Sequence, residues 1–143
     1  WNGSAWSEKA DMNQAKRNLA GFGTYTSAIG AGGETPSVTA NTESYDGTSW
    51  TEVNNMNTAR RALAGSGGTA SGLVYGGVPN TAKTESWNGT SWTEVGDLAA
   101  AISTNGGVGT GNTLALSFGG ESPITTSTEE WTATAAVSTV TTS

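Results

Sequence analysis

A short motif recurs along this chain at nearly constant spacing, and this repetition constrains the fold more than any other feature. The motif is an aromatic residue, Asn or Asp, Gly, two small residues and Trp, and it occupies residues 1–6, 45–50 and 87–92. A reduced copy begins at Trp131, so that successive copies start 44, 42 and 44 residues apart. A period in this range is typical of solenoids, propellers and other repeat arrays. The 143 residues therefore read as one repeat domain, with repeats at approximately 1–44, 45–86 and 87–130 and a degraded C-terminal strand at 131–143.

Other landmarks keep the same period and define the anchors of the repeat. The aromatic anchors are Trp6, Tyr45, Trp50, Trp87, Trp92 and Trp131. The glycine anchors are Gly32, Gly33, Gly76, Gly77, Gly119 and Gly120. We expect the aromatic residues to fill the space between sheets, because large apolar side chains contribute most to such cores.

Each repeat predicts four short strands that form an antiparallel sheet. The first, rich in Gly, is expected at 18–24, 62–68 and 104–110, and the second at 28–29, 73–75 and 114–118. The third is expected at 42–45, 84–87 and 128–131, and the fourth at 50–53 and 92–95. Asp46-Gly47 and Asn88-Gly89 separate the third strand from the fourth, and such dipeptides favour tight hairpins. Four strands per repeat correspond to one propeller blade.

These landmarks resemble the Kelch family. The family pattern is an apolar run into Gly-Gly, an aromatic residue, a Trp a few residues later, and a small-residue stretch after a basic position. Here it reads Leu73-Val74-Tyr75-Gly76-Gly77, Trp87 and Trp92, with Arg60 as the basic position. The resemblance implies an all-β fold, a Kelch-type β-propeller with about three blades in this chain. The repeat is shorter than the roughly 50 residues usual for Kelch, and the Gly-His and Trp-Asp signature of WD40 repeats does not occur.

The variant is also similar to Kelch-like repeats in structural and tail-fibre proteins of tailed bacteriophages. The similarity rests on compact units such as residues 45–53 and on a C-terminal tail rich in Thr and Val. It implies a structural or adhesive module of a virion, outside the cell, that binds a host-surface glycan or protein, copies of itself or other virion subunits. Two alternatives stay open: a secreted bacterial fibre or surface-adhesion protein, and an intracellular Kelch adaptor for a protein partner.

The composition argues against catalysis, nucleic-acid binding and membrane insertion. The chain has no His and no Cys, which removes the residues of Ser-His-Asp and Cys-His mechanisms. We therefore expect no enzymatic activity, no cofactor and no metal site. A net charge of −6 repels phosphate backbones. The longest apolar run, residues 98–102, is far shorter than a spanning helix requires.

The connections between the Gly-Gly pairs and the third strands differ most from repeat to repeat, and we take them as candidate binding loops. Their residues are Glu34, Thr35 and Pro36, then Pro79, Asn80 and Thr81, and then Glu121, Ser122 and Pro123. Unconstrained drift of the loop sequences is the alternative explanation. The basic pairs 16–17 and 60–61 precede the first strands, and one member of each is expected to bond to a carboxylate such as Glu43 or Glu85.

The two ends predict that further blades complete the assembly. Residues 1–9 read as the hairpin and fourth strand of a blade, and Thr132–Thr142 is suited to a strand. Because the chain opens inside a repeat and without Met, we expect residues upstream. Three blades are fewer than the four to eight of closed propellers, so either upstream blades or other copies of the chain are expected to supply the rest.

Overall fold

The computed structural model describes residues 3–121 and 124–133, and in this part of the chain every regular element is a strand. The all-β class is therefore confirmed. The first sheet contains β1 (Ala20–Thr24), β2 (Ser27–Ala31), β3 (Thr42–Tyr45) and β4 (Trp50–Val53). The second contains β5 (Ala64–Gly68), β6 (Ser71–Tyr75), β7 (Thr84–Trp87) and β8 (Trp92–Val95). The third contains β9 (Gly106–Gly109), β10 (Leu114–Phe118) and β11 (Thr128–Thr132).

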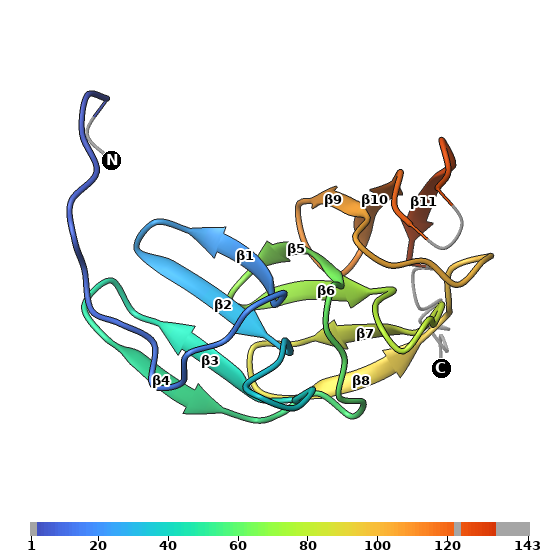
Figure 1. The fold of residues 1–143 in the computed structure, drawn as a ribbon. Coiled ribbons are helices and arrows are strands. Elements are labelled where there is room, and N and C mark those ends of the chain that lie inside the picture. The colour runs from blue at the N-terminus through green and yellow to red at the C-terminus, as the bar shows by residue number, and fades with distance from the viewer. Residues whose placement is uncertain (1–2, 122–123, 134–143) are drawn as a thin grey trace, which may run out of the picture.

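Each sheet is an antiparallel meander in which every strand pairs with the next one along the chain. The first two sheets have four strands, as the repeat predicts, and the third has three within the described residues. Figure 1 shows the three sheets following one another, with β1, β5 and β9 adjacent along one side. The tail from residue 134 onward, where the degraded strand is expected to continue, lies outside the described residues.

The first strand of each repeat begins two residues later than the sequence pattern predicts. The expected first residues, Asn18, Ala62 and Thr104, have φ angles of 55°, 53° and 54°. This left-handed conformation turns the chain sharply and cannot continue a strand. The third strands begin at the predicted residues. The fourth strands both begin and end where the sequence pattern places them. Thr and Trp residues mark these positions in the sequence.

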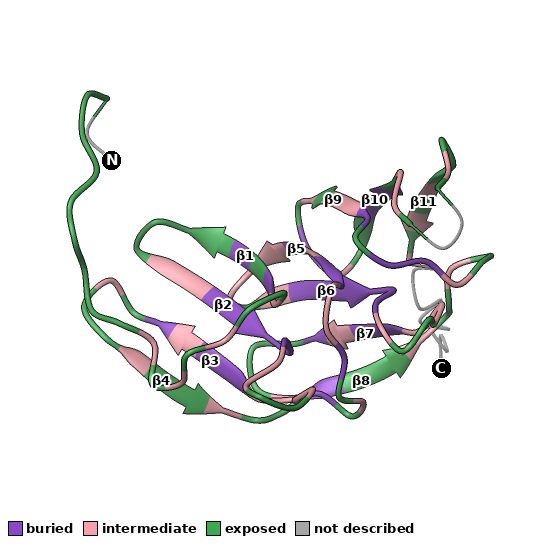
Figure 2. Cartoon of the chain, in the orientation of Figure 1, coloured by how far each residue is buried: buried purple, intermediate pink, exposed green. Residues whose placement is uncertain are grey.

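The main core lies between the first and second sheets. From the first sheet, Phe22 and Ile29 project toward Val74, Trp87 and Trp92 of the second. The rings of Phe22 and Trp92 meet edge to face, with centroids 6.3 Å apart. Figure 2 shows that buried residues are concentrated in β6, the second strand of the middle sheet. The expectation that Trp92 is core is confirmed, whereas Trp50 is only half-buried because it lies on the opposite, outward side of the first sheet.

A smaller core joins the second sheet to the third. It contains Leu73 and Tyr75 from β6 and Ala115 from β10, with Trp131 partly buried against them. The hydroxyl of Tyr75 reaches across the junction and donates a hydrogen bond to the carbonyl of Leu116 at 3.0 Å. A side chain at Gly107 would collide with the Tyr75 ring, so this glycine permits the close approach of the two sheets.

The segment before β1 begins away from the first sheet and then runs along it (Figure 1). Residues 3–9 form no strand, in contrast to the expected hairpin and fourth strand, and Trp6 is 85% exposed. Trp1 lies outside the described residues. Closer to β1 the segment is fixed, since the backbone N–H of Asn13 donates to Oε2 of Glu43 at 2.7 Å. Across the described chain no helix is present that is long and apolar enough to traverse a bilayer.

Candidate functional site

The most regular polar feature is a glutamate in the third strand of each sheet that accepts a hydrogen bond from the segment leading into that sheet. Oε2 of Glu43, Glu85 and Glu129 accepts a backbone N–H from Asn13, Asn57 and Ala99, respectively, at 2.7 Å in each case. The glutamates therefore fasten each sheet to the segment that precedes it. Their role is structural, which agrees with their recurrence in register.

Two of these glutamates also hold a buried cation, as the sequence predicts. Nζ of Lys16 lies 3.1 Å from Oε1 of Glu43, and Nη2 of Arg60 lies 3.0 Å from Oε1 of Glu85. Burial by itself raises the pKa of Glu43, but the hydrogen bonds from Asn13 and the charge of Lys16 outweigh it and leave that pKa below its ordinary value. Burial lowers the pKa of Arg60, and the charge of Glu85 opposes that change. At the same position the third repeat carries Ile102 instead of a cation.

The hairpin turns between the third and fourth strands are fixed by their first residue. Oδ1 of Asp46 accepts the backbone N–H groups of Thr48 and Ser49, both at 2.8 Å. Asn88 makes the same pair of bonds at 2.9 Å in the second sheet. The N–H groups of Ser49 and Thr48 lower the pKa of Asp46. These residues act as turn formers.

The candidate binding loops all leave the sheets at the same edge, each paired with the segment that leads into a first strand. Isolated bridges join Arg17 to Glu34, Arg61 to Val78 and Ser103 to Glu121. In the first loop Glu34 is engaged by two arginines, at 2.7 Å from Nε of Arg17 and 3.2 Å from Nε of Arg61. Glu34 therefore links the first two sheets, which leaves it little capacity for an external ligand.

The other loop residues lie mainly at the surface. Pro36, Pro79, Asn80 and Glu121 are exposed, Thr35 and Thr81 are half-buried, and Ser122 and Pro123 lie outside the described residues. A shallow hollow is lined by Thr35 and Pro36 together with Lys16 and Arg17. The loops thus present small and polar groups along one edge.

An open set of blades is expected to leave the faces of its first and last sheets bare, and the third sheet has such an exposed apolar face. Val108, Leu114, Leu116 and Phe118 point away from the second sheet and are 39–56% exposed. Alignment of the repeats indicates the apolar character of this face, because Leu114 occupies the position of Ser27 and Ser71 in the other two copies. On the first two sheets the corresponding face is covered by the next sheet, so Ile29 and Leu73 are buried.

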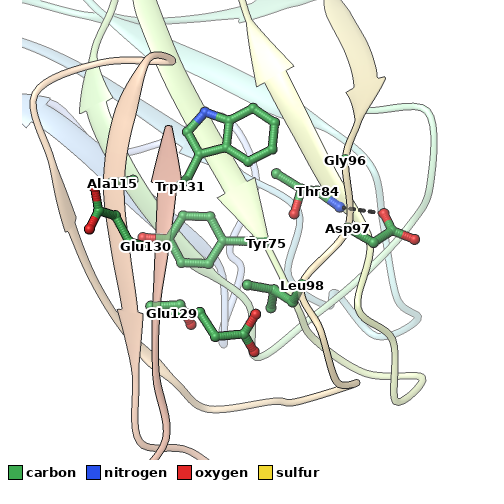
Figure 3. A pocket seen from close by; sticks show the side chains of 10 residues that line it. Tyr75, Thr84, Gly96, Asp97, Leu98, Ala115, Glu129, Glu130 and Trp131 are labelled. Atoms are coloured by element: carbon green, nitrogen blue, oxygen red, sulfur yellow. Dashed lines mark hydrogen bonds between the residues drawn. The ribbon is translucent and has the colours of Figure 1, made fainter. Parts of the chain in front are cut away.

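A pocket opens between the second and third sheets (Figure 3). Trp131, Tyr75 and Leu98 form its apolar lining, and Glu129, Glu130 and Asp97 line its polar part. Burial away from water raises the pKa of Tyr75. Asp97 is engaged as an acceptor from the backbone N–H of Thr84 at 3.3 Å. Between the first two sheets, Trp87 and Trp92 occupy the corresponding region.

The described residues bring together no group of three or more acidic side chains that could hold a metal ion. Comparison with models of known protein families gives no match, and comparison with curated proteins gives none either.

Proposed function

We propose that this chain is a set of Kelch-like β-propeller blades that serves as a non-enzymatic structural and adhesive module of a phage virion, at the particle surface. Its partners are copies of itself or other virion subunits, and a glycan or protein of the host surface. The repeated meander sheets, stacked with their first strands adjacent, support the propeller. The virion assignment is supported by the resemblance of the repeat units.

The observation that most strongly supports a binding role is the apolar outward face of the third sheet. Monomeric proteins rarely expose contiguous apolar surface unless it meets a partner. The loop edge that carries Pro79 and Asn80 supplies a second, polar surface. We assign the apolar face to assembly and the loop edge to the host surface.

Fractionation of the source organism tests the location. Particles purified on a density gradient are expected to contain the chain, and antibody against it is expected to label intact particles in electron micrographs. Recovery on bacterial cell surfaces without particles would instead favour a bacterial fibre. Recovery inside cells, bound to a cellular protein, would favour an adaptor.

Adsorption of the purified protein to host cells tests the loop edge. Asn80→Glu is expected to weaken adsorption, because it adds charge to an exposed position of the loop. Thr93→Glu is the matched control, since Thr93 is exposed on the outer strand β8, away from the loops. Equal adsorption by the two variants would contradict the assignment of the loop edge.

A further inference from the structure

We propose that the outward face of the third sheet and the edge strand β11 bind the first sheet of a second copy of this chain, with residues 6–9 of that copy added as a fourth strand. The inference rests on the proposed structural role. It is tested with pure protein, so that its failure is distinguishable from a failure of host or virion attachment.

The argument begins with the backbone at the two junctions inside the chain, which are alike. The N–H of Ala62 donates to the carbonyl of Asn18 at 2.7 Å, and the N–H of Thr104 donates to the carbonyl of Ala62 at 2.8 Å. One further step of the same repeat makes the N–H of Asn18 in a second copy the donor to the carbonyl of Thr104. The backbone at the third sheet is therefore already in the conformation that the next junction uses, with Thr104 at φ 54°.

Contacts between turns give a second, independent match. Oγ of Ser27 lies 2.8 Å from Oγ1 of Thr69, and Oγ of Ser71 lies 2.8 Å from Oδ1 of Asn112. At the next junction the repeat places Leu114 in the Ser27 position, opposite Tyr25 in the Thr69 position. These two side chains are 51% and 93% exposed in the single chain. The two junctions inside the chain thus have a polar contact at this position, and the proposed junction has an apolar contact between Leu114 and Tyr25.

The sheet faces also carry side chains that can interlock. Between the first two sheets the ring of Phe22 lies directly over Gly72, where a side chain would collide with it. The equivalent pair across the proposed junction is Val108 over Ala28. Val108 is smaller than Phe22 and Ala28 is larger than Gly72, so the change on one side partly offsets the change on the other.

The edge strand β11 sets the position of the added strand. Trp92–Val95 pairs with Thr84–Trp87 in the second sheet, with Trp92 opposite Trp87. The sequence Trp6-Ser7-Glu8-Lys9 matches Trp92-Thr93-Glu94-Val95 in three features: the leading Trp, a hydroxyl residue and Glu. In the same register Trp6 of the second copy lies opposite Trp131, at the mouth of the pocket between the second and third sheets. Residues 134–143 contain no aromatic residue that could take this place.

Such a junction is head to tail, since different surfaces of the two copies meet. Head-to-tail contacts close into rings or continue as open filaments, depending on the rotation at each step. Two copies contain six of these sheets, a number within the range of closed propellers. Either product contains the junction that we propose.

Single-cysteine variants test which surfaces meet, because the chain has no Cys of its own. Tyr25→Cys and Leu114→Cys are purified separately, mixed and oxidised. We expect a disulfide-linked pair with one chain of each variant, because bonding requires the two Cα atoms to approach within about 7 Å. Thr93→Cys mixed with Leu114→Cys is the control and is expected to give no linked pair. Linkage of Leu114→Cys to itself, with none to Tyr25→Cys, would overturn the proposal, since third sheets would then face each other.

Light scattering tests the association itself. The unmodified protein is expected to have a mass that is a multiple of 14.4 kDa. Leu116→Arg and Trp6→Ala are expected to lower it toward that of one chain, while Thr93→Arg leaves it unchanged. Both altered side chains are exposed in the single chain, so circular dichroism is expected to report an intact fold. A protein that is monomeric without substitution, or whose association survives Leu116→Arg, overturns the proposal.

Discussion

Arg60 and Glu85 form an ion pair that is completely buried in the middle of the chain, with Nη2 of Arg60 3.0 Å from Oε1 of Glu85. The guanidinium also donates through Nη1 to the carbonyls of Gly76 and Lys83, at 2.8 and 2.7 Å. The pair therefore binds together the linker before β5, the end of β6 and the start of β7. The same position is held by Lys16 and Glu43 in the first repeat.

Arg60→Met is expected to destabilise the protein by about 3–5 kcal/mol, because it leaves the Glu85 carboxylate buried without its cation. Urea or thermal unfolding measures this. Arg17→Met is the control, since Arg17 pairs with Glu34 but its side chain is 78% exposed, and we expect a loss of about 1 kcal/mol or less. Comparable losses in the two variants would mean that Arg60 is not held as described.

The stability of the fold is expected to fall in acid partly through Glu43. Its pKa in the folded chain lies below the ordinary value of 4.5, so the folded state favours the carboxylate. The resulting stabilisation is complete above pH 4.5 and is lost as the pH falls through the folded pKa. Unfolding measured between pH 7 and pH 3 is expected to show a weaker pH dependence for Glu43→Gln, and a lower stability at pH 7.

Glu52→Gln provides the control for that experiment. Glu52 faces Glu43 from the neighbouring strand β4 and is exposed. Its replacement is expected to leave the acid-induced loss of folding stability close to that of the unmodified protein. If the Glu43→Gln variant lost stability in acid as steeply as the unmodified protein, Glu43 would make no contribution to acid unfolding.

Trp92→Ala is expected to cost about 3–5 kcal/mol, as large-to-small changes in a core do. Trp50→Ala, at the equivalent position of the first sheet, is expected to cost about 1–2 kcal/mol, because only part of its apolar surface is removed from water. Thermal unfolding at low protein concentration, where copies do not associate, measures the difference. Equal losses would show that the outward side of the first sheet is covered within a single chain.

The sequence predicts best those parts of the fold that are determined locally. The fourth strands follow from Trp50 and Trp92, and the turns before them from Asp46 and Asn88, because side-chain bonds to neighbouring N–H groups fix such turns without help from distant residues. The ion pairs of Glu43 and Glu85 were also predictable, since a cation and a carboxylate recur at equivalent positions of the first two repeats. The role of these glutamates in fastening the preceding segment depends on tertiary contact, and no pattern signals it.

The repeat pattern alone does not determine burial where a neighbouring sheet is needed, although an open set of three blades predicts bare faces on its first and last sheets. Periodicity assigns the same burial to Leu116 as to Leu73, but Leu73 is buried by the third sheet and Leu116 is not covered. Similarly, residues 6–9 carry a strand pattern, yet a strand forms only against a free edge with which it can pair. The departures from the predicted pattern are therefore concentrated on the surfaces to which we assign assembly.

Thr104→Asn is expected to stabilise the protein by about 0.5–1 kcal/mol, a fraction of the cost of a left-handed conformation. Thr104 is exposed and has a φ of 54°, a left-handed conformation that is unfavourable for a β-branched side chain. Asn tolerates this conformation well, and Asn18 adopts it at the equivalent position of the first repeat, with a φ of 55°. The hydrogen bond from the Thr104 N–H to the carbonyl of Ala62 involves only backbone atoms and is retained. Thr110→Asn is the control, because Thr110 is also exposed but does not have a positive φ. A rise in melting temperature for Thr104→Asn alone supports the left-handed turn, whereas equal behaviour of the two variants contradicts it.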